Sequence, residues 1–171
     1  YPEAGENVIT DISFKAEKGE TVAIIGSTGS GKSTLINLIP RFYDATEGSV
    51  KVDGVDVREM TQKDVRDRIG YVPQKGVLFS GTIDSNIRYG KTEISEDAVK
   101  KAAEVAQATE FIDTKPERYK TPIAQGGSNV SGGQKQRLSI ARAIAKDPEI
   151  FIFDDSFSAL DFKTDSTLRK A

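Results

Sequence analysis

The chain has 171 residues, a formal net charge of −2 (24 Lys and Arg against 26 Asp and Glu), no cysteine and no histidine. This length suits one domain with its own hydrophobic core, and the balanced charge is unlike the basic surface of a nucleic-acid-binding protein. The missing residue types exclude disulfides, thiolate metal sites and a histidine general base, so acid–base chemistry must rest on carboxylates.

Both ends of the chain indicate that it is part of a longer protein. It begins with Tyr1-Pro2 and no initiator Met, and it ends at Lys170-Ala171 inside an expected helix. No apolar run approaches the ~20 residues that span a bilayer, and no signal peptide is visible. We therefore expect a fragment, and its lack of cysteine fits a reducing compartment.

The first quarter of the chain predicts a hairpin, a glycine-rich loop and a helix. Residues 8–14 and 21–25 are apolar, β-prone runs separated by a Lys-Gly-Glu turn, which favours an antiparallel hairpin with a buried second strand. Residues 26–33, Gly-Ser-Thr-Gly-Ser-Gly-Lys-Ser, fit the pattern G-x-x-x-x-G-K-[ST]. Residues 32–39 have the apolar spacing of a helix and stop before a proline.

A loop of this pattern predicts both a ligand and a chemistry. Its glycines let backbone N–H groups close around the α- and β-phosphates of a nucleotide, and the next helix points its positive end there. Lys32 would reach the β- and γ-phosphates, and the Ser33 hydroxyl would ligate Mg²⁺. The alternative is a glycine-rich turn with an unrelated lysine. The expected ATP-binding residues are Gly26, Ser27, Thr28, Gly29, Ser30, Gly31, Lys32, Ser33 and Thr34.

The rest of the chain alternates strand and helix signals around a helical middle. The predicted elements are strands at 48–54, 69–72 and 149–153 and helices at 61–68, 82–88, 95–108 and 131–145. This order predicts an α/β fold with a P-loop NTPase core, in which a mostly parallel sheet is flanked by helices. An N-terminal antiparallel β portion and an inserted helical subdomain complete it. We expect the ATP-binding core at 1–74 and 146–171 and the helical subdomain at 75–145.

Two carboxylates follow the last predicted strand. Asp154 ends an apolar run, where P-loop enzymes place an aspartate that holds Mg²⁺. Asp155 comes next, and a carboxylate there could orient or deprotonate the attacking water. Asp155 could equally be a helix N-cap or a turn residue.

The segment Val-Ser-Gly-Gly-Gln-Lys-Gln-Arg at residues 130–137 predicts a helix start. Ser131 and Gln134 have the spacing of a capping box. Gly132 and Gly133 in the first turn lower helix propensity by about 1 kcal/mol each relative to alanine. They also leave the N–H groups of the helix start open to an anion. The capping box therefore explains the serine and the glutamine but not the two glycines.

In this order, the motifs resemble those of the nucleotide-binding domain of an ABC (ATP-binding cassette) transporter, over essentially the whole chain. Residues 26–33 match the Walker A loop, and residues 150–154 match the Walker B strand. Residues 131–134 match the signature motif, with Val130 where leucine is usual, and Gln74 matches the Q-loop glutamine.

Two further positions carry the same resemblance. The segment Ser158-Ala-Leu-Asp161 matches the D-loop, and Tyr1 falls where the family has an aromatic that stacks on adenine. Residues 78–87 are similar to the exporter-type segment on which the coupling helices of the membrane domains pack.

The resemblance implies an ATPase with ATP and Mg²⁺ as cofactors. Gln74 and Asp155 would be catalytic, and the metal would be held by Ser33, Gln74 and Asp154. Two such domains sandwich two ATP molecules head to tail, so this chain would also contact its partner's ATP. The residues expected there are Ser131, Gly132, Gly133 and Gln134, together with Asp161 of the D-loop.

The expected partners are transmembrane domains and a second nucleotide-binding domain, with no nucleic acid, and the expected location is the cytoplasmic face of the membrane. Three other functions stay open: a regulatory module that binds ATP with negligible turnover, a soluble ABC ATPase, and an importer subunit. Residues 78–87 and the absence of a basic patch disfavour the last two.

Two residues depart from the family pattern. Asp155 stands where most members carry glutamate, and the shorter side chain draws the carboxylate back by about 1.5 Å. A misplacement of about 1 Å can cost on the order of a hundredfold in rate. We therefore favour a degenerate site in a heterodimer over a homodimer; the alternative is that Asp155 works through a repositioned water. Gln125 stands where exporters usually have a glutamate, which weakens any inferred salt bridge to the membrane domain.

Overall fold

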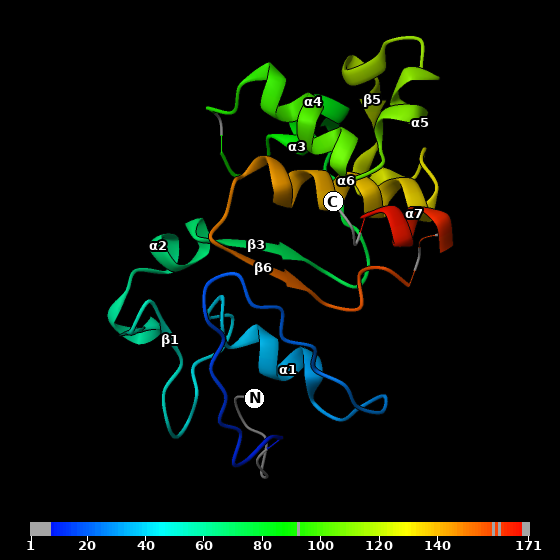
Figure 1. Ribbon diagram of the computed structural model, residues 1–171. Helices are drawn as coiled ribbons and strands as arrows, with labels where there is room; N and C mark the ends of the chain where they lie inside the picture. The colour runs from blue at the N-terminus through cyan, green and yellow to red at the C-terminus, as the bar shows by residue number, and fades with distance from the viewer. Residues whose placement is uncertain (1–7, 92, 159, 161, 169–171) are drawn as a thin grey trace. The chain divides into compact units, whose positions relative to one another are not determined.

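The computed structural model describes residues 8–91, 93–158, 160 and 162–168 (Figure 1). The chain forms two compact units, one ending at Arg66 and one beginning at Asp67. Tyr1, expected at the adenine, and Asp161, expected in the D-loop, lie outside the described residues.

The first unit contains short elements. They are α1 (Lys32–Asn37), β1 (Lys51–Val52), β2 (Val55–Asp56), the 3-10 helix η1 (Val57–Glu59) and α2 (Gln62–Asp67), whose last residue belongs to the second unit. Strands β1 and β2 pair antiparallel around Asp53-Gly54. Both turn residues have positive φ, 51° and 80°, as a two-residue hairpin turn requires. The expected Asp-Gly turn is confirmed, and the expected strand before it is shorter than predicted.

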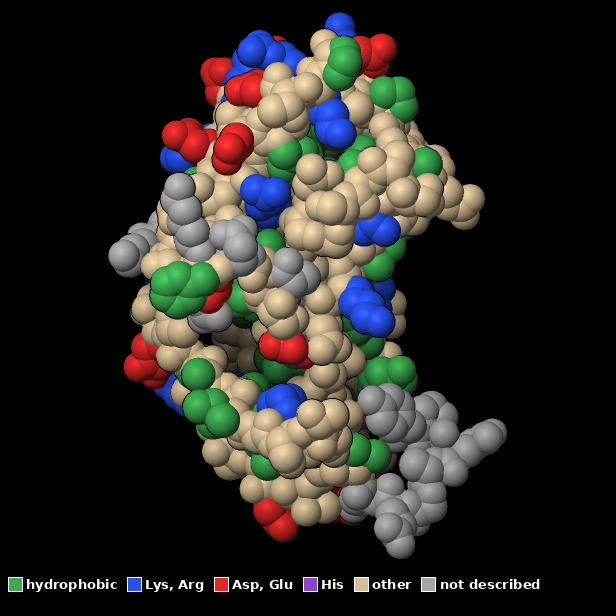
Figure 2. Space-filling model, turned by 90° about the vertical axis from the view of Figure 1, so that its right-hand side faces the viewer, with side chains coloured by type: hydrophobic (Ala, Val, Ile, Leu, Met, Phe, Trp, Pro, Cys, Tyr) green, Lys and Arg blue, Asp and Glu red, His purple; other side chains and the backbone are tan. Residues whose placement is uncertain are grey.

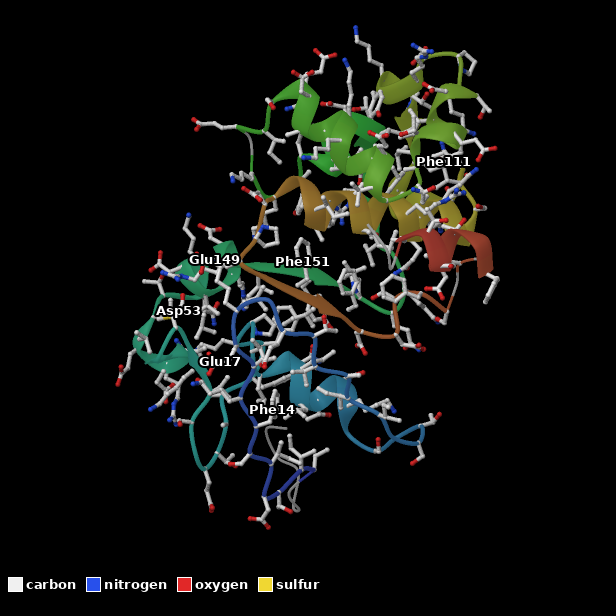
Figure 3. The ribbon with its side chains drawn as sticks, in the orientation of Figure 1. Phe14, Glu17, Asp53, Phe111, Glu149 and Phe151 are labelled. Atoms are coloured by element: carbon white, nitrogen blue, oxygen red, sulfur yellow. The ribbon has the colours of Figure 1, made fainter. Side chains whose placement is uncertain are left out.

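The hairpin predicted at residues 8–25 is not formed. Among the described residues 8–50, no strand is assigned, and the main-chain bond from Glu20 N to Glu17 O (3.0 Å) closes only a local turn. Ile25 is 93% exposed, and Phe14 is also exposed (Figure 3). An apolar, β-prone run becomes a strand only where a neighbouring strand pairs with its backbone, so residue type alone predicted too much here.

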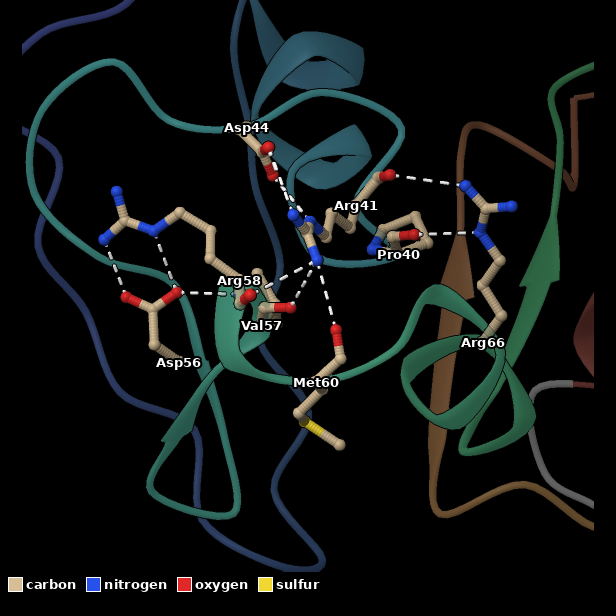
Figure 4. Close-up of polar contacts among 8 residues, drawn as sticks. All are labelled: Pro40, Arg41, Asp44, Asp56, Val57, Arg58, Met60 and Arg66. Atoms are coloured by element: carbon tan, nitrogen blue, oxygen red, sulfur yellow. Dashed lines mark hydrogen bonds and ion pairs between the residues drawn. The ribbon is translucent and has the colours of Figure 1, made fainter.

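Arginines hold the first unit together through backbone carbonyls (Figure 4). Arg41 Nη1 donates to the carbonyls of Val57 (3.2 Å) and Met60 (3.1 Å), while its Nε pairs with Asp44 (2.7 Å). Arg66 Nη2 donates to the Arg41 carbonyl (3.3 Å). These bonds join the end of the α1 segment to the segment after β2.

The second unit holds most of the helices. Its strands are β3 (Ile69–Val72), β4 (Gly81–Thr82), β5 (Pro122–Ile123) and β6 (Ile150–Phe153). Its helices are α3 (Ile83–Ile87), α4 (Glu96–Val105), α5 (Thr109–Asp113), η2 (Arg118–Lys120), η3 (Gln125–Gly127), α6 (Gly132–Ala145) and α7 (Phe162–Leu168). Helix α6 lies between the β3–β6 pair and the group α3, α4 and α5 (Figure 1).

Strands β3 and β6 pair in parallel, as the predicted parallel sheet requires. Ile69 lies opposite Ile150, and Val72 lies opposite Phe153. The ladder continues past the strands, since Asp154 N donates to the Val72 carbonyl (3.0 Å). Figure 3 marks Phe151 within β6. The carboxyl ends of the two strands therefore lie side by side, which is where α/β folds place their ligands.

The core of the second unit forms around α6. Its largest fully buried apolar side chains include Leu78, Ile83, Ile87, Ile112, Leu138 and Ile140. Complete burial of such a side chain contributes about 1.5–3 kcal/mol. Burial of Leu138 and Ile140 therefore fixes α6, and with it the position of the helix start.

A partly buried arginine ties α6 to the segment that follows β3. Arg142 donates from Nε and Nη2 to the carbonyl (2.8 Å) and Oδ1 (3.0 Å) of Asn86, and from Nη1 to the Val77 carbonyl (2.9 Å). Its Cζ lies 5.2 Å from the ring of Phe79 and 5.5 Å from that of Tyr89. Burial lowers the pKa of Arg142 to about 10, so the guanidinium keeps its charge at neutral pH.

Within the part of the chain that the structure describes, no helix combines the length and apolar character of a membrane span. Figure 2 shows Lys and Arg side chains interspersed with Asp and Glu on the face in view.

Candidate nucleotide-binding site

The glycine-rich loop of the first unit is exposed, and its own lysine reaches back across it. Lys32 Nζ donates to the carbonyls of Gly26 (2.8 Å) and Ser27 (2.7 Å). A turn bond from Ser30 N to the Ser27 carbonyl (3.2 Å) shapes the loop. The Lys32 ammonium therefore lies over the backbone of its own loop.

Gly31 is required by both its backbone angle and its surroundings. Its φ is 89°, in the left-handed region, and a Cβ there would lie 2.7 Å from Ile9 Cγ2. As the N-cap of α1, it offers no side chain to cap the helix. Ser33 is exposed and Thr34 partly exposed in the first turn of α1. All nine predicted loop residues therefore lie in one exposed loop and helix start.

Three predicted residues of the second unit meet at the carboxyl ends of β3 and β6. Gln74 follows β3 by two residues, and Asp154 and Asp155 follow β6 directly. Gln74 Nε2 donates to Asp155 Oδ2 at 3.1 Å. Tyr71 Oη donates to Asp154 Oδ2 across a long 3.5 Å. The structure thus brings Gln74 and the two carboxylates to one edge of the parallel pair.

Tyr71 was not predicted as part of the site. Burial, and after it the nearby Asp154 carboxylate, raises the pKa of Tyr71 to about 12, so its hydroxyl stays a proton donor at neutral pH. One signal was available in the sequence: Tyr71 lies next to the last residue of the predicted strand at 69–72, and Asp154 directly follows the predicted strand at 149–153.

Asp155 is a turn residue as well as a partner of Gln74. Its φ is 46°, and its carbonyl accepts from Ser158 Oγ at 2.9 Å. Aspartate tolerates this left-handed conformation better than most residues. Asp155 thus lies in a turn, as one of the two interpretations expected, and its catalytic role stays a prediction.

The start of α6 matches the predicted capping box. Ser131 Oγ accepts from Gln134 N (3.2 Å), and Gln134 Oε1 accepts from Ser131 N (3.1 Å). Ser131 and Gly132 are exposed, and a Cβ on Gly132 would meet no atom within 4 Å. Steric crowding in this chain therefore does not explain Gly132, and the exposed helix start is accessible to a ligand from outside.

The residues expected at the metal fit Mg²⁺ by ligand type. Ser33, Gln74 and Asp154 all offer oxygen atoms, which Mg²⁺ prefers. Over the described ranges, no group of three or more His, Cys, Asp or Glu side chains is arranged to hold a metal. Ser33 belongs to the first unit and Gln74 and Asp154 to the second, so this metal site stays a prediction.

The sequence and the structure of this chain both match members of one protein family. The sequence model of the ABC transporter family matches residues 9–158. An uncharacterised ABC transporter ATP-binding protein of Mycobacterium tuberculosis is 52% identical over 169 residues, which cover 97% of this chain and 29% of that protein. An ATP-dependent lipid A-core flippase of Desulfotalea psychrophila is 44% identical over 166 residues, with coverages of 97% and 29%.

A solved structure agrees. The ATP-bound structure of a bacterial Atm1-family ABC exporter superposes with a TM-score of 0.80 at 42% identity, over 84% of this chain and 25% of that chain. The chain spans 29% of the length of each of the two relatives named above. The family match covers most of the chain, and the fold and the ordered motifs agree with it. This chain is an ATP-binding domain of the ABC transporter family, with its α/β P-loop fold.

Proposed function

We propose that this chain binds Mg-ATP and uses its hydrolysis to power export of a substrate through associated transmembrane domains. The observation that carries the proposal is the meeting of Gln74, Asp154 and Asp155 at the carboxyl ends of β3 and β6. It supports a site where a glutamine and two carboxylates face one reacting group. The names of an exporter and a flippase among the similar proteins support the direction of transport.

The residues divide the work by chemistry. Lys32 and the amides of the loop would hold the phosphates, and Ser33, Gln74 and Asp154 would hold Mg²⁺, which neutralises phosphate charge when bound. Asp155 would orient the attacking water. Tyr1 would stack on adenine.

The partner side of the site is part of the same proposal. Ser131, Gly132, Gly133 and Gln134, with Asp161, would complete the ATP site of a second nucleotide-binding domain. The domain would work at the cytoplasmic face of the membrane, beside the transmembrane domains.

We further propose that this chain's own site is degenerate. The Asp155 carboxylate accepts from Gln74 at 3.1 Å, and its left-handed backbone favours a short side chain. A carboxylate drawn back in this way orients water poorly, so the chain would bind ATP and hydrolyse it slowly. Its signature residues, of which Ser131 and Gly132 are exposed, would then serve the competent site of a heterodimer partner.

The test is Mg-ATP turnover by the intact protein at saturating ATP, with and without its partner domain. We expect Asp155→Glu to raise turnover by about tenfold or more, because it returns the carboxylate by about 1.5 Å. Lys32→Ala should abolish ATP binding by this chain, because it removes the phosphate-binding ammonium.

The two parts of the proposal fail differently. Brisk wild-type turnover that Asp155→Glu leaves unchanged would refute the degenerate site but not the ATPase. Turnover that survives Lys32→Ala in the absence of the partner would refute ATP hydrolysis at this site.

A second candidate function is a regulatory ATP-binding module, and Asp155 is the observation that favours it. It predicts that ATP binds but that turnover with the partner present matches the Lys32→Ala background. Measurable wild-type turnover above that background excludes it.

A further inference from the structure

A buried glutamine of α6 forms hydrogen bonds with the backbone of the loop that carries Gln74. The side chain of Gln136 is 1% exposed. Its Oε1 accepts from Gly76 N at 2.8 Å, and its Nε2 donates to the Pro73 carbonyl at 3.1 Å. These two backbone groups stand on either side of the pair Gln74-Lys75, so one amide holds both ends of the loop.

The loop backbone also lies directly against the helix. A Cβ on Gly76 would lie 2.8 Å from both the carbonyl carbon and the carbonyl oxygen of Lys135, and 2.9 Å from Ser139 Oγ. No side chain fits there, so steric contact adds to the two hydrogen bonds. The loop is fixed to the first two turns of α6.

The same helix begins at the signature residues. Gln136 follows Ser131 by five residues, about 7.5 Å along a helix. In the loop that Gln136 holds, Gln74 Nε2 donates a hydrogen bond to Asp155 Oδ2 at 3.1 Å. The helix start and the Gln74–Asp155 contact are thus joined through a short set of satisfied hydrogen bonds.

We propose that Gln136 is a positioning residue that sets Gln74 against Asp155 and makes the Gln74 loop move with the start of α6. A partner's nucleotide that engages Ser131 and shifts α6 would therefore shift Gln74 as well. The hydrogen bonds from Gln136 to the loop are observed in the structure. Their effect on hydrolysis rests on the proposed function.

The test uses three variants of the intact protein. Gln136→Met keeps the length and removes both hydrogen bonds, which leaves the Gly76 N–H and the Pro73 carbonyl unpaired. Gln136→Glu keeps the acceptor for Gly76 N. Ile140→Val, on the same helix and also fully buried, is the matched packing control.

The first readout is amide hydrogen exchange of the peptide covering residues 73–80, which does not depend on hydrolysis. We expect Gln136→Met to speed this exchange by about tenfold, because a buried hydrogen bond is lost. Ile140→Val should leave it unchanged.

The second readout is the split between kcat and KM for ATP, measured on the intact protein without its partner domain. We expect Gln136→Met to lower kcat by about tenfold to a hundredfold, because Gln74 loses its placement by up to about 1 Å. KM should change by a smaller factor than kcat, since the loop at residues 26–33 that would hold the phosphates is untouched.

Gln136→Glu adds a pH signature. A protonated glutamic acid can donate to the Pro73 carbonyl, whereas the ionised form cannot, and burial favours the protonated form. The ratio of its kcat to that of the wild type should therefore rise as pH falls.

Each outcome decides a different statement. Unchanged exchange at residues 73–80 in both Gln136 variants would show that the Gln136 hydrogen bonds do not hold the Gln74 loop. Faster exchange with a kcat equal to that of Ile140→Val would overturn the positioning role. If the wild type shows no turnover, the proposed function fails. The exchange result then still decides whether Gln136 holds the Gln74 loop.

Discussion

At the scale of single residues, two glycines of the phosphate loop share a backbone conformation but not a neighbourhood. Gly29 and Gly31 have φ of 81° and 89°. A Cβ on Gly29 would meet no atom within 4 Å, whereas one on Gly31 would lie 2.7 Å from Ile9 Cγ2. The pair separates the cost of the backbone angle from the cost of crowding.

We expect Gly29→Ala to destabilise the fold by about 1–2 kcal/mol, the cost of a left-handed residue with a side chain. Gly31→Ala should cost about 1–3 kcal/mol more, because its methyl group must displace Ile9. Urea unfolding without nucleotide measures both. Equal losses would show that the segment around Ile9 yields freely.

At the scale of elements, the β1–β2 hairpin and η1 are joined by a carboxylate. Asp56 ends β2 and caps η1 by accepting from Arg58 N (2.9 Å). It also accepts from the guanidinium of Arg58 at Nε (3.0 Å) and Nη2 (2.7 Å) (Figure 4). These bonds, first from the Arg58 side chain and then from its N–H, lower the pKa of Asp56 to about 2.

This shift predicts a pH-dependent stability. A carboxyl whose pKa is lower in the folded state stabilises the fold above its unfolded pKa near 4 and loses that contribution as pH falls toward 2. We expect Asp56→Asn to be less stable than the wild type at pH 7, with the difference shrinking between about pH 4 and pH 2. Thermal unfolding across this range measures it.

The control is Glu47→Gln, which removes an exposed carboxylate outside this cluster. The same pH trend in both variants would assign the effect to net charge rather than to the Asp56–Arg58 contact. An Asp56→Asn deficit that persists at pH 2 would contradict the predicted linkage.

Sequence patterns predicted the elements well where the interactions are local. The Asp53-Gly54 turn and the Ser131–Gln134 capping box each depend on residues within a few positions, and both are present. The strand ending at Phe153 was predicted to within one residue. The hairpin prediction for residues 8–25 was wrong because pairing partners, and not residue types alone, decide whether a strand forms.

At the scale of the whole molecule, the proposed heterodimer has two unequal ATP sites, and this chain would contribute residues to both. In that proposal, Lys32 would serve the chain's own, slow site, while Ser131 would serve the partner's competent site. In a complex with the partner, Ser131→Arg should lower total turnover by about a hundredfold, because it blocks donors to the competent site. Lys32→Ala should lower it much less.

Steady-state ATPase rates of the assembled complex measure this difference. In a homodimer each variant would disable both sites, and the two losses would be alike. Equal losses would therefore overturn the heterodimer proposal while leaving the ATPase intact.

The ligand class could be predicted from the sequence alone, because a phosphate loop works through eight consecutive residues whose backbone makes the site. Only the tertiary structure decided which distant groups meet. Gln74 and Asp155 are separated by 81 positions, and Gln136 and Gly76 by 60. Such contacts depend on how β3, β6 and α6 pack, and packing is set by the burial of many side chains at once rather than by any short pattern.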